Sequence, residues 1–372
     1  MVQALERVRP DSSQPVIRDS VALLKHATAE CPNLGDAWYY RSVLERKLGN
    51  TRLADYSLEK ATQVGSEAMR QQLDPFKLAA PPSTVPLGPV RQKWALVVGI
   101  GQFKDRYINR NPLKYTKGDA KALANLLTNP KVGRFNPANV QVLTDSQATT
   151  RAIKEDLNWL AREAGPDDLV VIYISTHGTS REMDTRDVNY LVTYDTEIVS
   201  PSPQQDDQDQ LHYQDRLYAS ALPMVDVANE VANRLSARRV AIILDTCFSG
   251  AAVAGDSQRT APGLTYSSVS SATLNRMRQG TGRVILAASQ GNQESLEDSV
   301  LAHGYFTYYL LQGLQQNQGM DSLAKIFPYV QEQVSSRARA HNHEQTPVLA
   351  VSDQGAQIVL GAVPAGTAAA SP

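Results

Sequence analysis

The strongest pattern along the chain is a set of short apolar runs that end in small or polar residues. Two of these runs, 169–174 and 240–244, are apolar throughout and lead into Ser-Thr-His-Gly and Asp-Thr-Cys. Continuous apolar runs of this length are typical of strands buried on both faces of a parallel sheet. Such sheets present their functional groups at the carboxyl ends of the strands. We therefore expect His177 and Cys247 to end two buried strands at one edge of a sheet.

Further apolar runs alternate with amphipathic segments from residue 94 to residue 351. The pattern predicts strands at 94–100, 140–143, 284–288 and 348–351, and helices at 117–127, 149–164, 225–235, 305–314 and 322–334. Strands that alternate with helices indicate an α/β fold with a mostly parallel sheet. Two long polar stretches, 179–218 and 255–282, follow the His and Cys strands, and loops of this length are often functional.

Residues 16–72 have helical periodicity and a weak internal repeat. Ala27 and Ala61 are 34 residues apart, which is the period of tetratricopeptide helix pairs. The alternative is a plain helical hairpin. Five prolines between 75 and 89 predict an extended linker. We expect a helical, tetratricopeptide-like segment at 1–74, a linker at 75–91, a catalytic domain at 92–358 and a flexible tail at 359–372.

Composition and charge exclude several classes of protein. The chain has 372 residues, 42% of them hydrophobic, which suffices for a large core. A net charge of −1 argues against nucleic acid or an anionic membrane as a partner. Two cysteines exclude a disulfide framework and disfavour a cysteine zinc site. No apolar run has the length of a membrane span, and residues 1–11 lack the apolar core of a secretory signal. We expect a cytoplasmic protein.

Cys247 and His177 are candidates for nucleophilic catalysis. A thiol reacts as a thiolate, and an imidazole beside it can take the thiol proton and later protonate a leaving amine. Gly178 has no side chain, so its N–H and that of Cys247 can form an oxyanion hole. The alternatives are a buried core cysteine and a hydrogen-bonded loop histidine.

Two carboxylates accompany the proposed nucleophile. Asp245 lies two residues before Cys247 and so points to the same side of its strand. Asp119 opens the helix after the first strand, at the same rim of the sheet. Paired carboxylates suit a cationic side chain, and Arg suits them best because it binds bidentately. The alternatives are a helix N-cap for Asp119 and a carboxylate that orients local backbone for Asp245.

From 94 to about 354 the chain resembles the caspase-like cysteine peptidases of clan CD (family C14), above all bacterial orthocaspases and metacaspases. The motifs that carry the resemblance lie at 95–100, 118–120, 175–178, 245–250, 286–290, 304–307 and 345–348. It implies a caspase-like three-layer sandwich, a His177–Cys247 dyad, and oxyanion donors at Gly178 and Cys247. It also implies a P1 pocket (the S1 site) lined by Asp119, Ser175 and Asp245. The chain departs from the family at Thr176, where many relatives have Gly, and at Phe248, where metacaspases often have His.

The two long loops suggest two further properties. A protease specific for basic residues can cut its own loop at Arg259, Arg276 or Arg278, and the alternative is an uncut surface loop. The other loop clusters acidic residues that suit calcium, which many metacaspases need, but polar disorder explains the cluster equally well. Those residues are Asp184, Asp187, Asp206, Asp207 and Asp209.

The sequence therefore predicts a cysteine endopeptidase that cleaves after Arg, with Lys as the second basic choice, through a thioester acyl-enzyme. Its partner is a protein or peptide substrate, and the helical segment has a protein partner of its own. We expect a monomer, by analogy with metacaspases, and no cofactor or metal apart from the calcium alternative. The competing hypotheses are a catalytically silent scaffold that recruits partners through the helical segment, and another Cys–His acyl-transfer enzyme on the same fold.

Overall fold

The computed structural model divides the chain into two compact units, Met1–Pro82 and Ser83–Pro372. The boundary between them falls inside the stretch expected to be a linker. The structure describes residues 14–31, 34–48, 50–64, 87–110, 112–178, 189–198, 215–247, 277, 282–289, 293–352 and 354–364.

The larger unit is built on a six-stranded sheet with the order β10-β7-β6-β3-β1-β2. All neighbouring strands are parallel except β10, which runs antiparallel to β7 at one edge. This arrangement confirms the expected α/β class and mostly parallel sheet. The strands are β1 (Lys93–Gly99), β2 (Val140–Thr144), β3 (Leu169–His177), β6 (Arg239–Cys247), β7 (Gly282–Ala287) and β10 (Val348–Val351).

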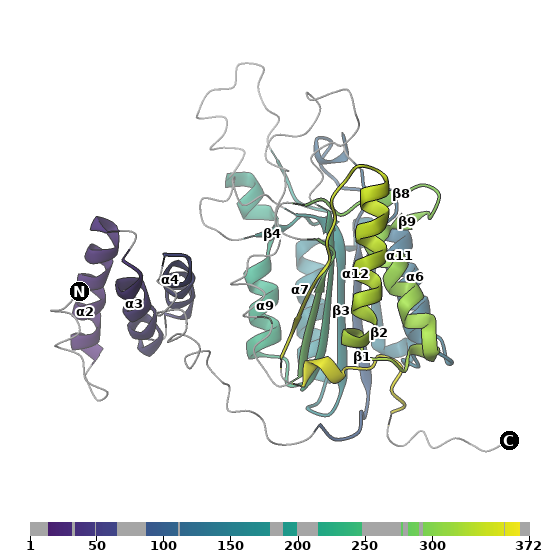
Figure 1. The fold of residues 1–372 in the computed structure, drawn as a ribbon, viewed down its shortest axis with the longest axis horizontal. Coiled ribbons are helices and arrows are strands. Elements are labelled where there is room, and N and C mark those ends of the chain that lie inside the picture. Colours follow the sequence, from purple (N-terminus) through teal and green to yellow (C-terminus); the bar gives the residue numbers. More distant parts are fainter. Residues whose placement is uncertain are drawn as a thin grey trace. The chain divides into compact units, whose positions relative to one another are not determined.

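Helices cover both faces of the sheet, which gives the three layers that the resemblance to caspase-like peptidases implies (Figure 1). One layer holds α7 (Thr150–Glu163) and α9 (Met224–Asn233). The other holds α6 (Thr116–Thr128), α11 (Tyr305–Gln315) and α12 (Leu323–Ala340). Short pairs and 3-10 turns complete the unit: β4 (Tyr190–Leu191), β5 (Leu222–Pro223), β8 (Glu297–Asp298), β9 (His303–Gly304), η2 (Ile108–Arg110), η3 (Pro137–Asn139), η4 (Asp145–Gln147), η5 (Gln316–Gly319) and η6 (Gly355–Gln357).

Strand β3 shows why the sheet forms where the apolar runs predict it. All nine of its residues are buried. Successive side chains point to opposite faces, so Ile172 and Ile174 pack into the α7–α9 layer, and Val171 and Tyr173 pack into the α6–α11–α12 layer. A strand that contributes to two cores has no solvent-facing side, which explains its unbroken apolar sequence.

One stretch differs from the sequence prediction. Residues 179–218 were expected to form one polar loop, but Tyr190, Leu191, Val192 and Ile198 are buried and join the α7–α9 core. Strand β4 pairs with β5, and residues 215–220 are helical. The apolar residues are too few and too closely flanked by polar ones to produce a periodic pattern.

The smaller unit contains α2 (Gln14–Glu30), α3 (Gly35–Lys47) and α4 (Thr51–Val64), as the helical periodicity predicts. Small residues at Ala37, Ala54 and Ala61 are fully buried, which allows close helix packing. A tetratricopeptide-type repeat stays a prediction. Within the described helices of either unit, none combines the length and the hydropathy that a bilayer crossing requires.

Candidate active site

The proposed nucleophile and base end adjacent strands. In the parallel pair β3–β6, His177 is the register partner of Cys247, and Ser175 is the register partner of Asp245. Because side chains alternate along a strand, the positions of all four residues lie on one face of the sheet. The sheet therefore brings the four sequence-predicted strand-end residues together. The side chain of Cys247, unlike its backbone, lies outside the described part of the structure.

His177 is held in a defined environment. It is 2% exposed, and its ring stacks on Phe103 with centroids 5.4 Å apart and an interplanar angle of 24°. Its carbonyl oxygen accepts a hydrogen bond from Val192 N at 2.9 Å. Gly178 is also buried and forms a β-bridge with Leu191. The β4 segment thus continues the sheet edge beside the proposed base.

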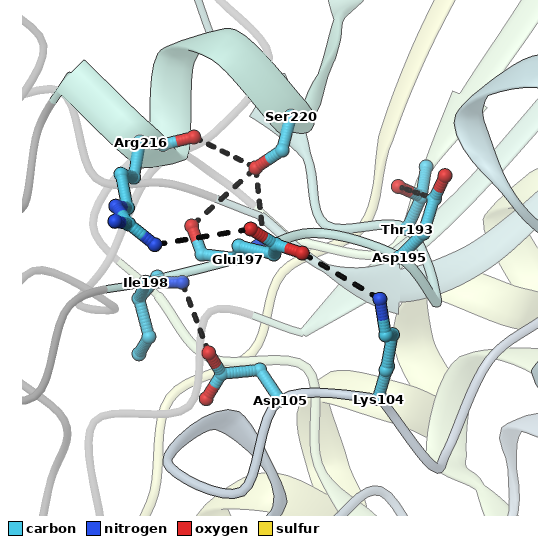
Figure 2. Close-up of polar contacts among 8 residues, drawn as sticks. All are labelled: Lys104, Asp105, Thr193, Asp195, Glu197, Ile198, Arg216 and Ser220. Atoms are coloured by element: carbon cyan, nitrogen blue, oxygen red, sulfur yellow. Dashed lines mark hydrogen bonds and ion pairs between the residues drawn. The ribbon is translucent and has the colours of Figure 1, made fainter.

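The segment 192–198 is tied down by backbone hydrogen bonds at its far end (Figure 2). Ile198 N donates to Asp105 Oδ2 at 3.0 Å, and Glu197 N donates to Ser220 Oγ at 2.9 Å. The exposed Glu197 carboxylate also faces two cations, Lys104 at 3.6 Å and Arg216 at 4.0 Å. Exposed ion pairs of this kind add little stability, so the backbone bonds fix the segment.

A further hydrogen bond connects this segment to the loop that lies beside His177. Lys104 N donates to Tyr194 O at 2.8 Å, which joins the segment 192–198 to the loop that follows β1. That loop carries Phe103, whose ring stacks on His177. The loop therefore contacts the imidazole of His177 through Phe103, and the segment 192–198 contacts its backbone carbonyl through Val192. No sequence pattern predicted this support.

Asp119 lies in the first turn of α6 and is 1% exposed. Its side chain does not cap the helix, because Oδ2 accepts from Gly304 N at 3.0 Å and Oδ1 contacts His303 Nδ1. This excludes the N-cap alternative. Burial raises the pKa of Asp119, and the hydrogen bonds from His303 and Gly304 oppose that rise.

Asp245 is 2% exposed and lies at the end of β6. Ser295 Oγ donates to its Oδ1 at 2.8 Å, and Thr307 Oγ1 donates to its Oδ2 at 2.5 Å. Within the described residues its hydrogen bonds come from these distant hydroxyls and not from local backbone, which argues against the backbone-orienting alternative. Burial, and then the charge of Asp119, raises the pKa of Asp245 to about 7.

The two carboxylates converge at Gly304. A β-carbon at this position would lie 3.2 Å from Asp119 Oδ2 and 3.3 Å from Asp245 Oδ2. Ser175, the register partner of Asp245, is 1% exposed, and its side chain interacts with the buried Tyr173 hydroxyl. A buried acidic pair with hydroxyl groups beside it is suited to a cationic, multiply donating group.

Glu297 and His303 also belong to this cluster, and the sequence did not single them out as site residues. Glu297 accepts hydrogen bonds from Lys114 N at 2.8 Å and Tyr115 N at 2.9 Å, and so anchors the start of α6. Burial raises the pKa of Glu297, and the nearby Asp119 charge adds to that rise. Both residues come from the short β8–β9 pair, which has no apolar periodicity to reveal it.

Gln345, from the motif at 345–348, forms hydrogen bonds that support the residues around Asp245. Its Nε2 donates to Ala288 O at 3.0 Å and to Ser295 Oγ at 3.2 Å, and its Oε1 accepts from Leu296 N at 3.0 Å. Ser295 in turn donates to Asp245, so the amide of Gln345 orients the hydroxyl that binds this carboxylate. Gln345 is 1% exposed, so these bonds are shielded from water.

Other sequence-predicted sites fall where the structure gives no description. The acidic residues proposed for calcium and the arginines proposed for self-cleavage lie outside the described residues. Among the side chains that are described, no group of three or more His, Cys, Asp or Glu residues is arranged to hold a metal ion.

Comparison with known proteins gives one family match. The sequence model of the family described as "Caspase domain" matches residues 92–357, which confirms the resemblance to caspase-like peptidases. The expected likeness to bacterial orthocaspases and metacaspases stays a prediction. A search of curated proteins returns no match.

Two solved structures are similar to the chain at low sequence identity. A Geobacter sulfurreducens protein is 16% identical, with a TM-score of 0.49 over 73% of this chain and 99% of that one. Caspase-1 from Spodoptera frugiperda is 14% identical, with a TM-score of 0.43 over 71% of this chain and 88% of that one.

Proposed function

Because the chain belongs to the caspase domain family, whose members are cysteine peptidases by type, we propose that it hydrolyses peptide bonds after basic residues. Cys247 is the nucleophile, His177 is the general acid–base, and Arg is the preferred P1 residue with Lys second. The observation that carries this proposal is the buried carboxylate pair. Asp245 lies at the strand end that carries Cys247, beside the strand end that carries His177, and Asp119, in the first turn of α6, converges with it at Gly304.

The register of β3 and β6 supports the chemistry of the dyad. His177 takes the proton of the Cys247 thiol, and the thiolate attacks the carbonyl carbon of the scissile bond. The N–H groups of Gly178 and Cys247 stabilise the oxyanion. His177 then gives its proton to the leaving amine, which leaves a thioester. Water, deprotonated by His177, hydrolyses that thioester and restores the thiol.

The buried acidic pair supports the preference for a basic P1 residue. Removing a guanidinium from water is costly unless carboxylates receive it, and here two already buried carboxylates converge at Gly304. Arg presents five donors in a planar fork, whereas Lys is a point charge. An acidic P1 side chain would face like charge at Asp119 and Asp245 and would be rejected.

Two accompanying properties are also proposals. We propose that the loop 255–282 is cut by the enzyme itself at an arginine, and that the helical segment recruits a protein partner. We propose no cofactor, with calcium binding by the acidic loop as the alternative. A thiol nucleophile works in a reducing compartment, which supports the expected cytoplasmic location. The silent-scaffold alternative is not favoured, because both members of the proposed dyad are present.

A panel of fluorogenic peptides that differ only at P1 tests the proposal. We expect release of fluorophore with Arg, less with Lys, and none with Asp. The panel is run in calcium and in chelator, so that a calcium requirement is not mistaken for inactivity. Failure to cleave any peptide in either condition would refute the proposed function.

A further inference from the structure

His303 connects the buried carboxylate pair to solvent. Its Nδ1 contacts Asp119 Oδ1, and its side chain is 25% exposed whereas that of Asp119 is 2% exposed. It belongs to β9, directly before Gly304, whose N–H donates to the other oxygen of the same carboxylate. Both oxygens of Asp119 are thus engaged by consecutive residues of one strand.

The imidazole of His303, when protonated, is the cation that pairs with Asp119. Among the described residues, no Lys or Arg forms an ion pair with Asp119 or Asp245. The register partner of His303 is Asp298, whose carboxylate is bound by Arg337. The Tyr308 ring lies beside His303, with the two ring centroids 5.9 Å apart. Asp119 itself interacts with the carboxylates of Asp245 and Glu297, the latter with Lys114 beside it, and with the buried Tyr173 hydroxyl.

A protonated His303 and a P1 guanidinium compete for the same charge. The hydrogen bond to Asp119 raises the pKa of His303 above its usual range, so the empty pocket stabilises the imidazolium more than water stabilises that of a free histidine. A second cation brought to the carboxylate pair repels that proton. By thermodynamic reciprocity, the proton on His303 weakens binding of the P1 cation by the same factor.

We propose that His303 is a specificity-determining residue that couples P1 binding to proton release: its imidazolium neutralises Asp119 in the empty pocket and loses its proton to solvent when a guanidinium binds. This inference rests on the proposed function, since it concerns the pocket for the basic P1 residue. It implies that affinity for Arg substrates increases as the pH rises through the titration of His303.

The test uses the full chain carrying Cys247→Ala, with its histidines labelled with ¹³C, and agmatine as the guanidinium probe. The imidazole signals are followed by NMR from pH 5 to pH 9 with and without agmatine, and the His303 signal is assigned by its loss in His303→Gln. We expect saturating agmatine to lower the pKa of His303 by at least one unit. His341, exposed at the end of α12, is the internal control and should not shift.

A His303 pKa that is unchanged or raised by agmatine would overturn the inference, and so would absence of any agmatine effect. The second readout is the KM for an Arg peptide in the chain with Cys247 intact. Between pH 6 and pH 8, KM should fall several-fold more than in His303→Gln, which keeps a neutral hydrogen-bond donor beside Asp119. The dependence left in that variant comes from Asp245. Equal pH dependence in both proteins would contradict the inference, whereas absence of Arg cleavage in both would refute the proposed function instead.

Discussion

His177 and Cys247 are register partners at the ends of two adjacent parallel strands. Each strand is an unbroken apolar run that contributes to the cores on both faces of the sheet. A slip of one residue would turn every core side chain to the wrong face. The cost of such a slip fixes the register, and the register fixes the relative position of base and nucleophile. The core of the protein therefore sets the geometry of the proposed dyad.

Replacement of His177 by Gln should lower kcat for an Arg peptide by about 10²- to 10⁴-fold, the usual contribution of a general acid–base. The loss follows because the amide cannot take the thiol proton. The measurement is steady-state hydrolysis, with His341→Gln as the matched histidine control. Activity within a few-fold of the parent chain would show that another group serves as the base.

Gly304→Ala should raise the KM for Arg peptides about tenfold or more, as expected when a methyl group overpacks a filled site at a cost of about 1–3 kcal/mol. The added β-carbon would lie 3.2 Å and 3.3 Å from the two carboxylates. Gly118→Ala is the matched control, because a β-carbon there meets no atom within 4 Å. An unchanged KM in Gly304→Ala would place the P1 side chain elsewhere.

Asp245→Asn should abolish the preference for Arg at P1. The same change should also make the folded protein more stable above pH 7. The pKa of Asp245 is raised from 3.8 to about 7, so between these values the folded chain keeps a proton that the unfolded chain has lost. The stability that the folded chain gains from the protonated Asp245 is full below about pH 4 and is lost as the pH rises to about 7.

The Asn variant has no such loss, and we expect its advantage in the free energy of unfolding to grow over this range by about 4 kcal/mol, because each unit of pKa shift is worth about 1.4 kcal/mol. Chemical denaturation at pH 5 and pH 8 measures the difference. Asp226→Asn, at a half-exposed ion pair on α9, is the control and should change little. A variant less stable than the parent at pH 8 would contradict the assigned cost of the buried charge.

The sequence predicts the sheet well because its signals are long. The β3 and β6 runs face two cores and so contain no polar interruption, and they place His177, Cys247 and Asp245 without further information. Asp119 is predicted at the same rim because the helix after β1 must start there, although α6 begins three residues earlier, at Thr116.

The rest of the site could not be predicted because it depends on contacts between distant short segments. His303 and Glu297 belong to two-residue strands that have no periodicity. The role of Gln345 arises from hydrogen bonds to Ala288 and Ser295, more than 45 residues away. The support of His177 by Phe103 likewise requires the tertiary fold.

Covalent labelling by an arginyl acyloxymethyl ketone, read by peptide mass spectrometry, tests the central claim most directly. We predict one adduct on the peptide that contains Cys247, none in Cys247→Ala, and none with the matched aspartyl reagent. Cys31, the other cysteine of the chain, is exposed and reports non-specific alkylation. Equal labelling of Cys247 by both reagents would contradict the basic pocket, and labelling confined to Cys31 would contradict Cys247 as the nucleophile.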